Sequence, residues 1–204
     1  GVLIADSVPR LHVWSRQGQP LREIGTGSTS VSDVAGAGAY AYALVRNAGV
    51  SRVEQAGFSN DEYRFSKRDG QWPLALDSDG QAAAVLDAAR QEVFLVGADL
   101  SSQGGWRTER LGSLGQIDLA SSGSSVFIAN QATSMLEVWT RSGALVHEVP
   151  TIGRPRRVAA SPDGNAYLLT DRNWVEAYGP EGDELDVSFV GSAADAPVDL
   201  TVDE

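Results

Sequence analysis

Residues 161 to 178 read "SPDGNAYLLTDRNWVEAY": a polar turn with glycine, an apolar run ending in an acid, and an apolar run ending in an aromatic residue. The same order of features recurs in "PLALDSDGQAAAVLDAARQEVFLV" at 73 to 96 and in "QIDLASSGSSVFIANQATSMLEVW" at 116 to 139. Short apolar runs of about four to eight residues, separated by glycine, serine and aspartate turns, predict strands and not helices. The stretch is therefore one copy of a repeated β-unit.

The length of the repeat follows from its turn glycines, which are Gly38, Gly80, Gly123 and Gly164. Successive glycines are 42, 43 and 41 residues apart. Each unit continues after a further turn, such as "TRSGA" (140 to 144), into an alternating segment, such as "LVHEV" (145 to 149). Four strands in a unit of about 42 residues are typical of a propeller blade.

The two ends of the chain each match part of a unit. Residues 1 to 14 match a unit without its inner strand, and residues 196 to 204 match an inner strand alone. With the whole units between them, they predict an all-β fold: a five-bladed β-propeller of four-stranded antiparallel blades. The C-terminal inner strand would join the N-terminal blade and close the ring. The alternative is a fragment of a longer propeller whose next blade begins at Pro197.

We expect a single domain over residues 1 to 204. The expected blades cover about 1–25 plus 196–204, 30–66, 72–111, 115–150 and 155–190. Large side chains recur at the end of the third strand, as Trp14, Trp139 and Tyr178, and are expected to pack between neighbouring blades.

The repeats resemble those of NHL and YVTN-type propellers. The resemblance rests on "PVDLTVDE" (197 to 204), "PLALDSDGQAAAVLD" (73 to 87) and "SPDGNAYLLTD" (161 to 171), and it covers nearly the whole chain. It implies a scaffold that binds protein, ligand or occasionally RNA, often on extracytoplasmic bacterial proteins. These motifs specify blades and not chemistry, and a few relatives are enzymes.

Composition narrows the classes of function. The 204 residues carry a formal net charge of −11, which repels phosphate backbones, so nucleic acid is not an expected partner. The chain has no cysteine and two histidines, which excludes disulfides and thiolate sites and disfavours a histidine-rich metal centre. No apolar run approaches the ~20 residues that cross a bilayer, and no signal peptide is visible, so we expect no direct membrane insertion.

A polar residue recurs at the end of the second strand, as Asp6, Asp87, Asn130 and Asp171. Such a side chain can accept hydrogen bonds from the backbone of the following turn. The alternative is that Asp87, Asn130 and Asp171 gather at one mouth of the propeller and resemble the site of a metal-dependent lactonase. Repetition favours the structural interpretation, because an active site would be expected in one blade.

Carboxylates near the predicted axis are a second set of candidate functional residues. Asp33, Asp118 and Asp199 fall on predicted inner strands at comparable repeat positions. Two axial carboxylates about 5 to 9.5 Å apart would suit glycoside hydrolysis, and several together would suit Ca²⁺. Their equivalence again favours a structural role, so we predict no catalytic residue, no metal site and no cofactor, with Ca²⁺ as the alternative.

A binding face is predicted from loops that open on the same side of a propeller. These are the loops between second and third strands and the segments before inner strands, and they carry arginine and tryptophan, which are enriched at binding hot spots. The predicted binding residues are Trp72, Arg154, Arg156, Arg172, Asn173 and Trp174.

The sequence thus predicts a non-catalytic protein-interaction or scaffold propeller. We expect it to be an accessory subunit of a larger, membrane-associated, extracytoplasmic assembly, in the periplasm or secreted. A rigid loop face would bind a protein partner with little ordering cost. The alternatives are a propeller hydrolase or lactonase acting on a carbohydrate-like substrate, and a lectin that binds a small-molecule ligand through aromatic loops.

Overall fold

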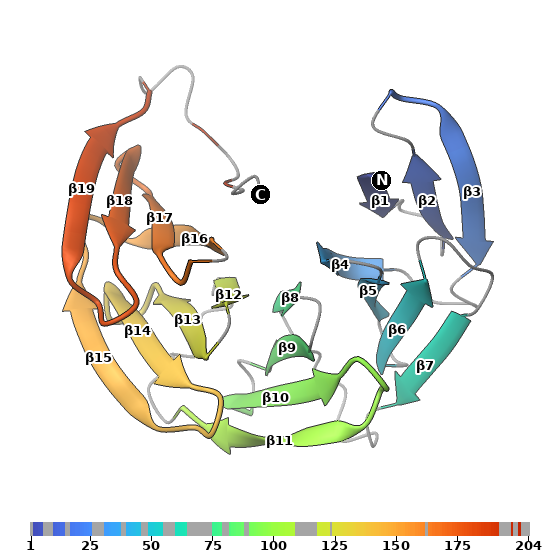
Figure 1. The fold of residues 1–204 in the computed structure, drawn as a ribbon. Helices are drawn as coiled ribbons and strands as arrows, with labels where there is room; N and C mark the ends of the chain where they lie inside the picture. Colours follow the sequence, from blue (N-terminus) through green and yellow to red (C-terminus); the bar gives the residue numbers. More distant parts are fainter. Residues whose placement is uncertain are drawn as a thin grey trace.

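The computed structural model consists of antiparallel β-sheets arranged in an arc (Figure 1). It describes residues 2–5, 10–14, 17–25, 31–37, 40–45, 49–54, 60–64, 75–78, 82–87, 90–108, 118–122, 124–161, 163–191, 197 and 200. None of these residues belongs to a helix that is long and apolar enough to span a membrane.

Five sheets are formed by the described residues, and we number them 1 to 5 along the chain. Sheet 1 holds β1 (Val2–Ala5), β2 (Arg10–Trp14) and β3 (Pro20–Gly25). Sheet 2 holds β4 (Val31–Ala37), β5 (Tyr40–Val45), β6 (Gly49–Glu54) and β7 (Asn60–Arg64). Sheet 3 holds β8 (Ala75–Ser78), β9 (Ala82–Asp87), β10 (Glu92–Gly97) and β11 (Ser102–Arg107). Sheet 4 holds β12 (Asp118–Ser122), β13 (Ser125–Asn130), β14 (Met135–Thr140) and β15 (Leu145–Pro150). Sheet 5 holds β16 (Pro155–Ala160), β17 (Ala166–Thr170), β18 (Trp174–Tyr178) and β19 (Glu184–Phe189).

Within each sheet the strands are hydrogen-bonded in the order in which they occur in the chain. The first strands lie innermost, and β1, β4, β8, β12 and β16 each contact the next along the arc (Figure 1). Sheets 1 and 5 stand at the two ends of the arc. Of the segment predicted to close the ring, 196 to 204, the structure describes only Pro197 and Leu200, so closure at five blades stays a prediction.

The core lies between neighbouring sheets. One buried cluster joins sheets 3 and 4 and includes Leu86, Val126 and Trp139, and a second joins sheets 4 and 5 and includes Phe127 and Tyr178. In sheets 3 and 4 the strands β9, β13 and β14 are buried on both faces, because these sheets have a neighbouring sheet on either side. Trp139 and Tyr178 therefore pack between sheets, as predicted from their position in the repeat.

Candidate functional site: a polar hollow between sheets 4 and 5

A polar hollow of about 320 Å³ lies where loops of sheets 4 and 5 meet. It is bordered by the β13–β14 loop, by the segment that leads from β15 into β16, and by the β17–β18 hairpin. Its lining residues are Ser134, Thr151, Ile152, Gly153, Arg154, Asp171 and Arg172. The hollow thus joins the two loop types that the sequence places on one face of the fold.

Reciprocal hydrogen bonds join the segment before β16 to the β17–β18 hairpin. The backbone N–H of Arg154 donates to Asp171 Oδ1 at 2.9 Å, and the backbone N–H of Asp171 donates to the Arg154 carbonyl at 2.8 Å. Gly153 permits this approach, since a Cβ there would lie 2.7 Å from Asp171 Oδ1. The backbones that carry the two arginines of the hollow are therefore held at a fixed spacing.

The rest of the β15–β16 segment is fixed in the same way. The backbone N–H of Thr151 donates to the Ser134 carbonyl at 3.1 Å, and Thr151 Oγ1 lies 2.6 Å from the Gly153 carbonyl oxygen. The backbone N–H of Ile152 donates to Glu176 Oε1 at 3.0 Å. Because few of these groups must be ordered on binding, the hollow is preorganised for a ligand.

Glu176, which accepts the hydrogen bond from Ile152 of the β15–β16 segment, is fully buried and has a raised pKa. Burial raises the pKa of its carboxyl above the ordinary value of 4.5, although hydrogen bonds from the Tyr178 hydroxyl and from Ile152 N–H act in the opposite direction. Burial disfavours the charged form of an acid because the carboxylate loses its hydration. The folded protein therefore holds a proton on Glu176 to higher pH than the unfolded chain does.

We expect Glu176→Gln to flatten the loss of stability as pH rises above the ordinary glutamate value. Where the folded state binds more protons than the unfolded state, the free energy of unfolding falls with pH, and glutamine removes this contribution. Its amide can still accept from Ile152 N–H and donate to the Tyr178 oxygen. Urea unfolding from about pH 4.5 to pH 8 measures the effect. Parallel stability curves for variant and wild type would show that Glu176 does not titrate differently on folding.

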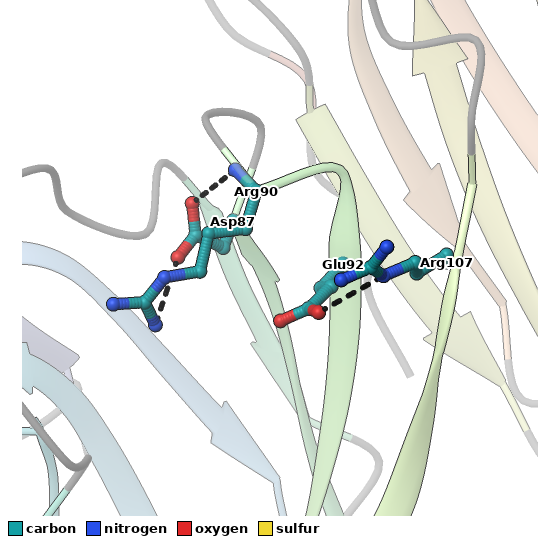
Figure 2. A network of polar contacts seen from close by, with 4 residues as sticks. All are labelled: Asp87, Arg90, Glu92 and Arg107. Carbon is teal, nitrogen blue, oxygen red and sulfur yellow. Dashed lines mark hydrogen bonds and ion pairs between the residues drawn. The ribbon is translucent and has the colours of Figure 1, made fainter. Parts of the chain in front are cut away.

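Three arginines elsewhere in the described part of the fold are paired with acids of their own sheet, the first being Arg10 with Glu23 in sheet 1. In sheet 3, Arg90 Nη1 lies 3.5 Å from Asp87 Oδ2, and Arg107 Nε donates to Glu92 Oε1 at 3.4 Å (Figure 2). Figure 2 also shows the Arg90 backbone N–H donating to Asp87 Oδ1, at 3.1 Å. These guanidinium groups are therefore partly neutralised by neighbours.

The predicted binding arginines differ from these. Across the described ranges of the chain, the side chains of Arg154, Arg156 and Arg172 make no hydrogen bond and no ion pair. Arg154 and Arg172 are exposed and line the hollow. Arg156 does not line it: this half-buried residue lies where the register between β16 and β17 shifts, an irregularity of the kind that re-aims side chains.

The other predicted binding residues have different placements. Asn173 is buried, with φ 62°, and its backbone N–H donates to the Thr170 carbonyl at 3.1 Å, so its position is that of a turn residue. Trp174 is half-buried and its ring packs edge-on against Phe189, with centroids 5.4 Å apart, outside the residues that line the hollow. Trp72 lies outside the described residues.

The structural interpretation of the repeated polar residue is confirmed for two of its copies. Asn130 Oδ1 accepts from the backbone N–H groups of Ala132 and Thr133, at 3.1 and 3.2 Å. Asp87 accepts from the backbone of its own turn in the same manner. Both side chains are fully buried and stabilise the loop that follows the second strand.

The prediction is wrong for Asp171, which does not occupy the same place. Leu168 pairs with Glu176 as Ile128 pairs with Glu137, so the buried Thr170 corresponds to Asn130. Asp171 is one residue further on, is exposed, and bonds to the segment before β16. The buried position lies seven residues after Gly123 in one repeat but six residues after Gly164 in the other, so equal spacing from the glycine places Asp171 one residue too far along the chain.

The acids considered for catalysis or Ca²⁺ are not gathered at a common site in what the structure describes. Over the described residues no three histidine, aspartate or glutamate side chains lie close enough to share a metal ion. Asp33 Oδ1 accepts from the Val34 backbone N–H at 2.9 Å. Only the backbone of Asp118 is described, and Asp199 lies outside the described residues. The axial alternative is therefore untested.

Comparisons with known proteins identify the fold. The chain superposes on a streptogramin B lyase with a TM-score of 0.75 at 12% identity, over 95% of this chain and 66% of the lyase. It superposes on a chain of the mitotic checkpoint complex with a TM-score of 0.74 at 10% identity, over 98% of this chain and 64% of the other. It superposes on the RRP9 WD40 repeats with a TM-score of 0.73 at 15% identity, over 92% of this chain and 59% of the other. The chain thus spans about two thirds or less of the length of each of these structures.

The class of protein is therefore a β-propeller, as the repeats predicted. No protein-family model matches the sequence, and a search of curated proteins finds no relative. The assignment to NHL-type repeats within the propellers stays a prediction. Because a lyase and WD40 proteins share this fold, any function has to be argued from the hollow itself.

Proposed function

We propose that the protein is a non-catalytic binding propeller that recognises a protein partner through the hollow between sheets 4 and 5. The observation that carries the proposal is the pair Arg154 and Arg172, exposed, without partners among the described residues, and fixed on either side of the hollow. Unpaired arginines on a chain of net charge −11 are available for an anionic group of the partner.

The overall negative charge does not prevent such a contact. At physiological ionic strength the screening length is about 8 Å, so charges further away than this act weakly on a group inside the hollow. Two guanidinium groups and one carboxylate line the hollow, and the local balance is positive. Repulsion at longer range instead disfavours polyanions such as nucleic acids, which cannot place all of their charge in one hollow.

Rigidity of the segment before β16 supports a binding role for this site. The segment before β16 is bonded to the β13–β14 loop, to the β17–β18 hairpin and to the buried Glu176. A surface held in this way loses little conformational entropy when a partner docks. The acid of the hollow, Asp171, accepts a hydrogen bond from the Arg154 backbone, which is a positioning role.

We expect Arg154→Glu combined with Arg172→Glu to weaken partner binding by about 2 kcal/mol or more, roughly thirtyfold or more in Kd. Both arginines are exposed, so the variant should keep the wild-type unfolding midpoint. Partners cross-linked to the protein in the cells that make it would be identified, purified and titrated by calorimetry against both forms.

Arg107→Glu in sheet 3 is the matched control, because Arg107 is an exposed arginine whose reversal changes the net charge in the same direction. The control should keep every partner at close to wild-type affinity. The proposal fails if the double variant, still folded, retains all partners of the wild type.

A further inference from the structure

We infer that the hollow and an apolar ridge beside it form one site for an extended peptide that carries a carboxylate next to a bulky apolar side chain. The ridge consists of Trp174, Phe189 and Val190. The inference rests on the proposed function, because it names the chemistry of the partner segment that binds there.

The ridge exposes large apolar side chains at the end of β19. Phe189 is 58% exposed and Val190 is 44% exposed, while the half-buried ring of Trp174 supports Phe189 from β18. The backbone N–H of Val190 donates to the Asn173 carbonyl at 2.9 Å, which ties the ridge to the hairpin that carries Arg172. Apolar groups placed together in this way on a surface favour contact with another apolar group.

The ridge and the hollow are continuous through Ile152 and the hairpin. Ile152 lines the hollow, is 42% exposed, and its backbone bonds to Glu176 of β18. Side chains two residues apart on a strand project from the same face, so Trp174 lies on the face of β18 that Ile152 approaches. Arg172 and Trp174 are themselves only two residues apart in the chain. A ligand seated in the hollow would therefore find apolar surface directly beside it.

Charge favours a carboxylate over a phosphate as the anionic group. The hollow is lined by two arginines and one aspartate, and the sum of these charges matches a singly charged carboxylate. A phosphate monoester at neutral pH carries about −1.5 to −2 and would face the Asp171 carboxylate as well. Planar guanidinium groups also match the two oxygens of a carboxylate in geometry.

An extended peptide is the ligand that uses both parts of this surface. Successive residues of an extended chain are at most about 3.3 to 3.6 Å apart, so an acid and an apolar side chain a few residues apart can reach the hollow and the ridge together. A small free carboxylate would occupy the hollow alone. The partner segment is therefore expected to place aspartate or glutamate within about three residues of an aromatic or branched aliphatic residue.

Selection from a displayed library of random, unphosphorylated heptapeptides tests the inference. On the wild-type protein the enriched peptides should combine an acid with a nearby bulky apolar residue. The Arg154→Glu and Arg172→Glu double variant should lose the preference for the acid, and Phe189→Ser should lose the preference for the apolar residue. Each change should weaken binding of a selected synthetic peptide by about tenfold or more.

Two controls make the outcome specific. Leu185→Ser removes another exposed apolar side chain of β19, at 53% exposure, and Arg107→Glu removes a distant exposed arginine. Both should select the same peptides as the wild type. Enrichment without acids, or an apolar preference that survives Phe189→Ser, overturns the inference while leaving the proposed function intact if cellular partners still depend on the arginines. If those partners bind the double variant unchanged, both proposals fail.

Discussion

Gly143→Ala should lower the free energy of unfolding by about 3 kcal/mol. Gly143 lies in the β14–β15 hairpin of sheet 4 with φ 84°, a left-handed conformation that alanine adopts only with strain. An added Cβ would lie 2.6 Å from Trp106 Cβ on β11 of sheet 3. Trp106 is stacked on Trp139 at 6.0 Å between centroids, so neither ring can move away without disturbing the seam between the sheets.

Gly18→Ala is the matched control for this substitution. Gly18 lies at the equivalent hairpin of sheet 1 with φ 74°, but nothing lies within 4 Å of the position of its Cβ. Its replacement should therefore cost about 1 kcal/mol, from backbone strain alone. Denaturant unfolding of both variants measures the difference. Equal losses at the two positions would show that the hairpin of sheet 4 does not pack against sheet 3 as described.

Glu137→Ala should also destabilise the protein by about 3 kcal/mol. Glu137 is buried in β14 and accepts from Asn130 Nδ2 at 2.7 Å and from Trp139 Nε1 at 2.9 Å. Alanine would remove the acceptor for two buried donors and leave a small cavity beside the Trp139 ring. Glutamine keeps one acceptor oxygen, so Glu137→Gln should have an intermediate effect.

Glu92→Ala provides the comparison with an exposed pair. Glu92 lies at the start of β10, the third strand of sheet 3, and its bond to Arg107 is at the surface, where such pairs contribute about 0 to 1 kcal/mol. Thermal and urea unfolding of the three variants should give losses in the order Glu137→Ala, Glu137→Gln, Glu92→Ala. A Glu137→Ala variant as stable as Glu92→Ala would contradict a structural role for the buried network.

Much of the fold could be predicted from the sequence because the interactions that specify strands are local and repeat. Each unit contains its own turn residues and its own apolar runs, and side chains such as Trp139 and Tyr178 recur at fixed offsets from them. The same repetition led to the misplacement of Asp171. Equal spacing from the turn glycine suggests an equivalent position, but in sheet 5 the buried position lies one residue nearer to the glycine, so Asp171 falls outside the buried row.

The candidate site was predictable in part. The loop positions of Arg154 and Arg172 placed them on one face, and the structure shows them at one hollow. No pattern in the sequence distinguishes them from Arg90 or Arg107. Arg90 is paired with Asp87, three residues earlier in the chain, and Arg107 is paired with Glu92 on the adjacent strand. Whether an arginine is paired depends on the directions of side chains and on strand register, which composition does not contain.

The sequence by itself determined the class of architecture, because the period of its glycines and apolar runs leaves four-stranded blades as the arrangement that buries every unit against the next. Only the tertiary structure decided which polar residues meet between blades. The bond from Ile152 N–H to Glu176 joins residues 24 positions apart and brings the segment that leaves sheet 4 onto β18 of sheet 5. Such contacts depend on how one sheet packs against its neighbour, a property that no single repeat unit encodes.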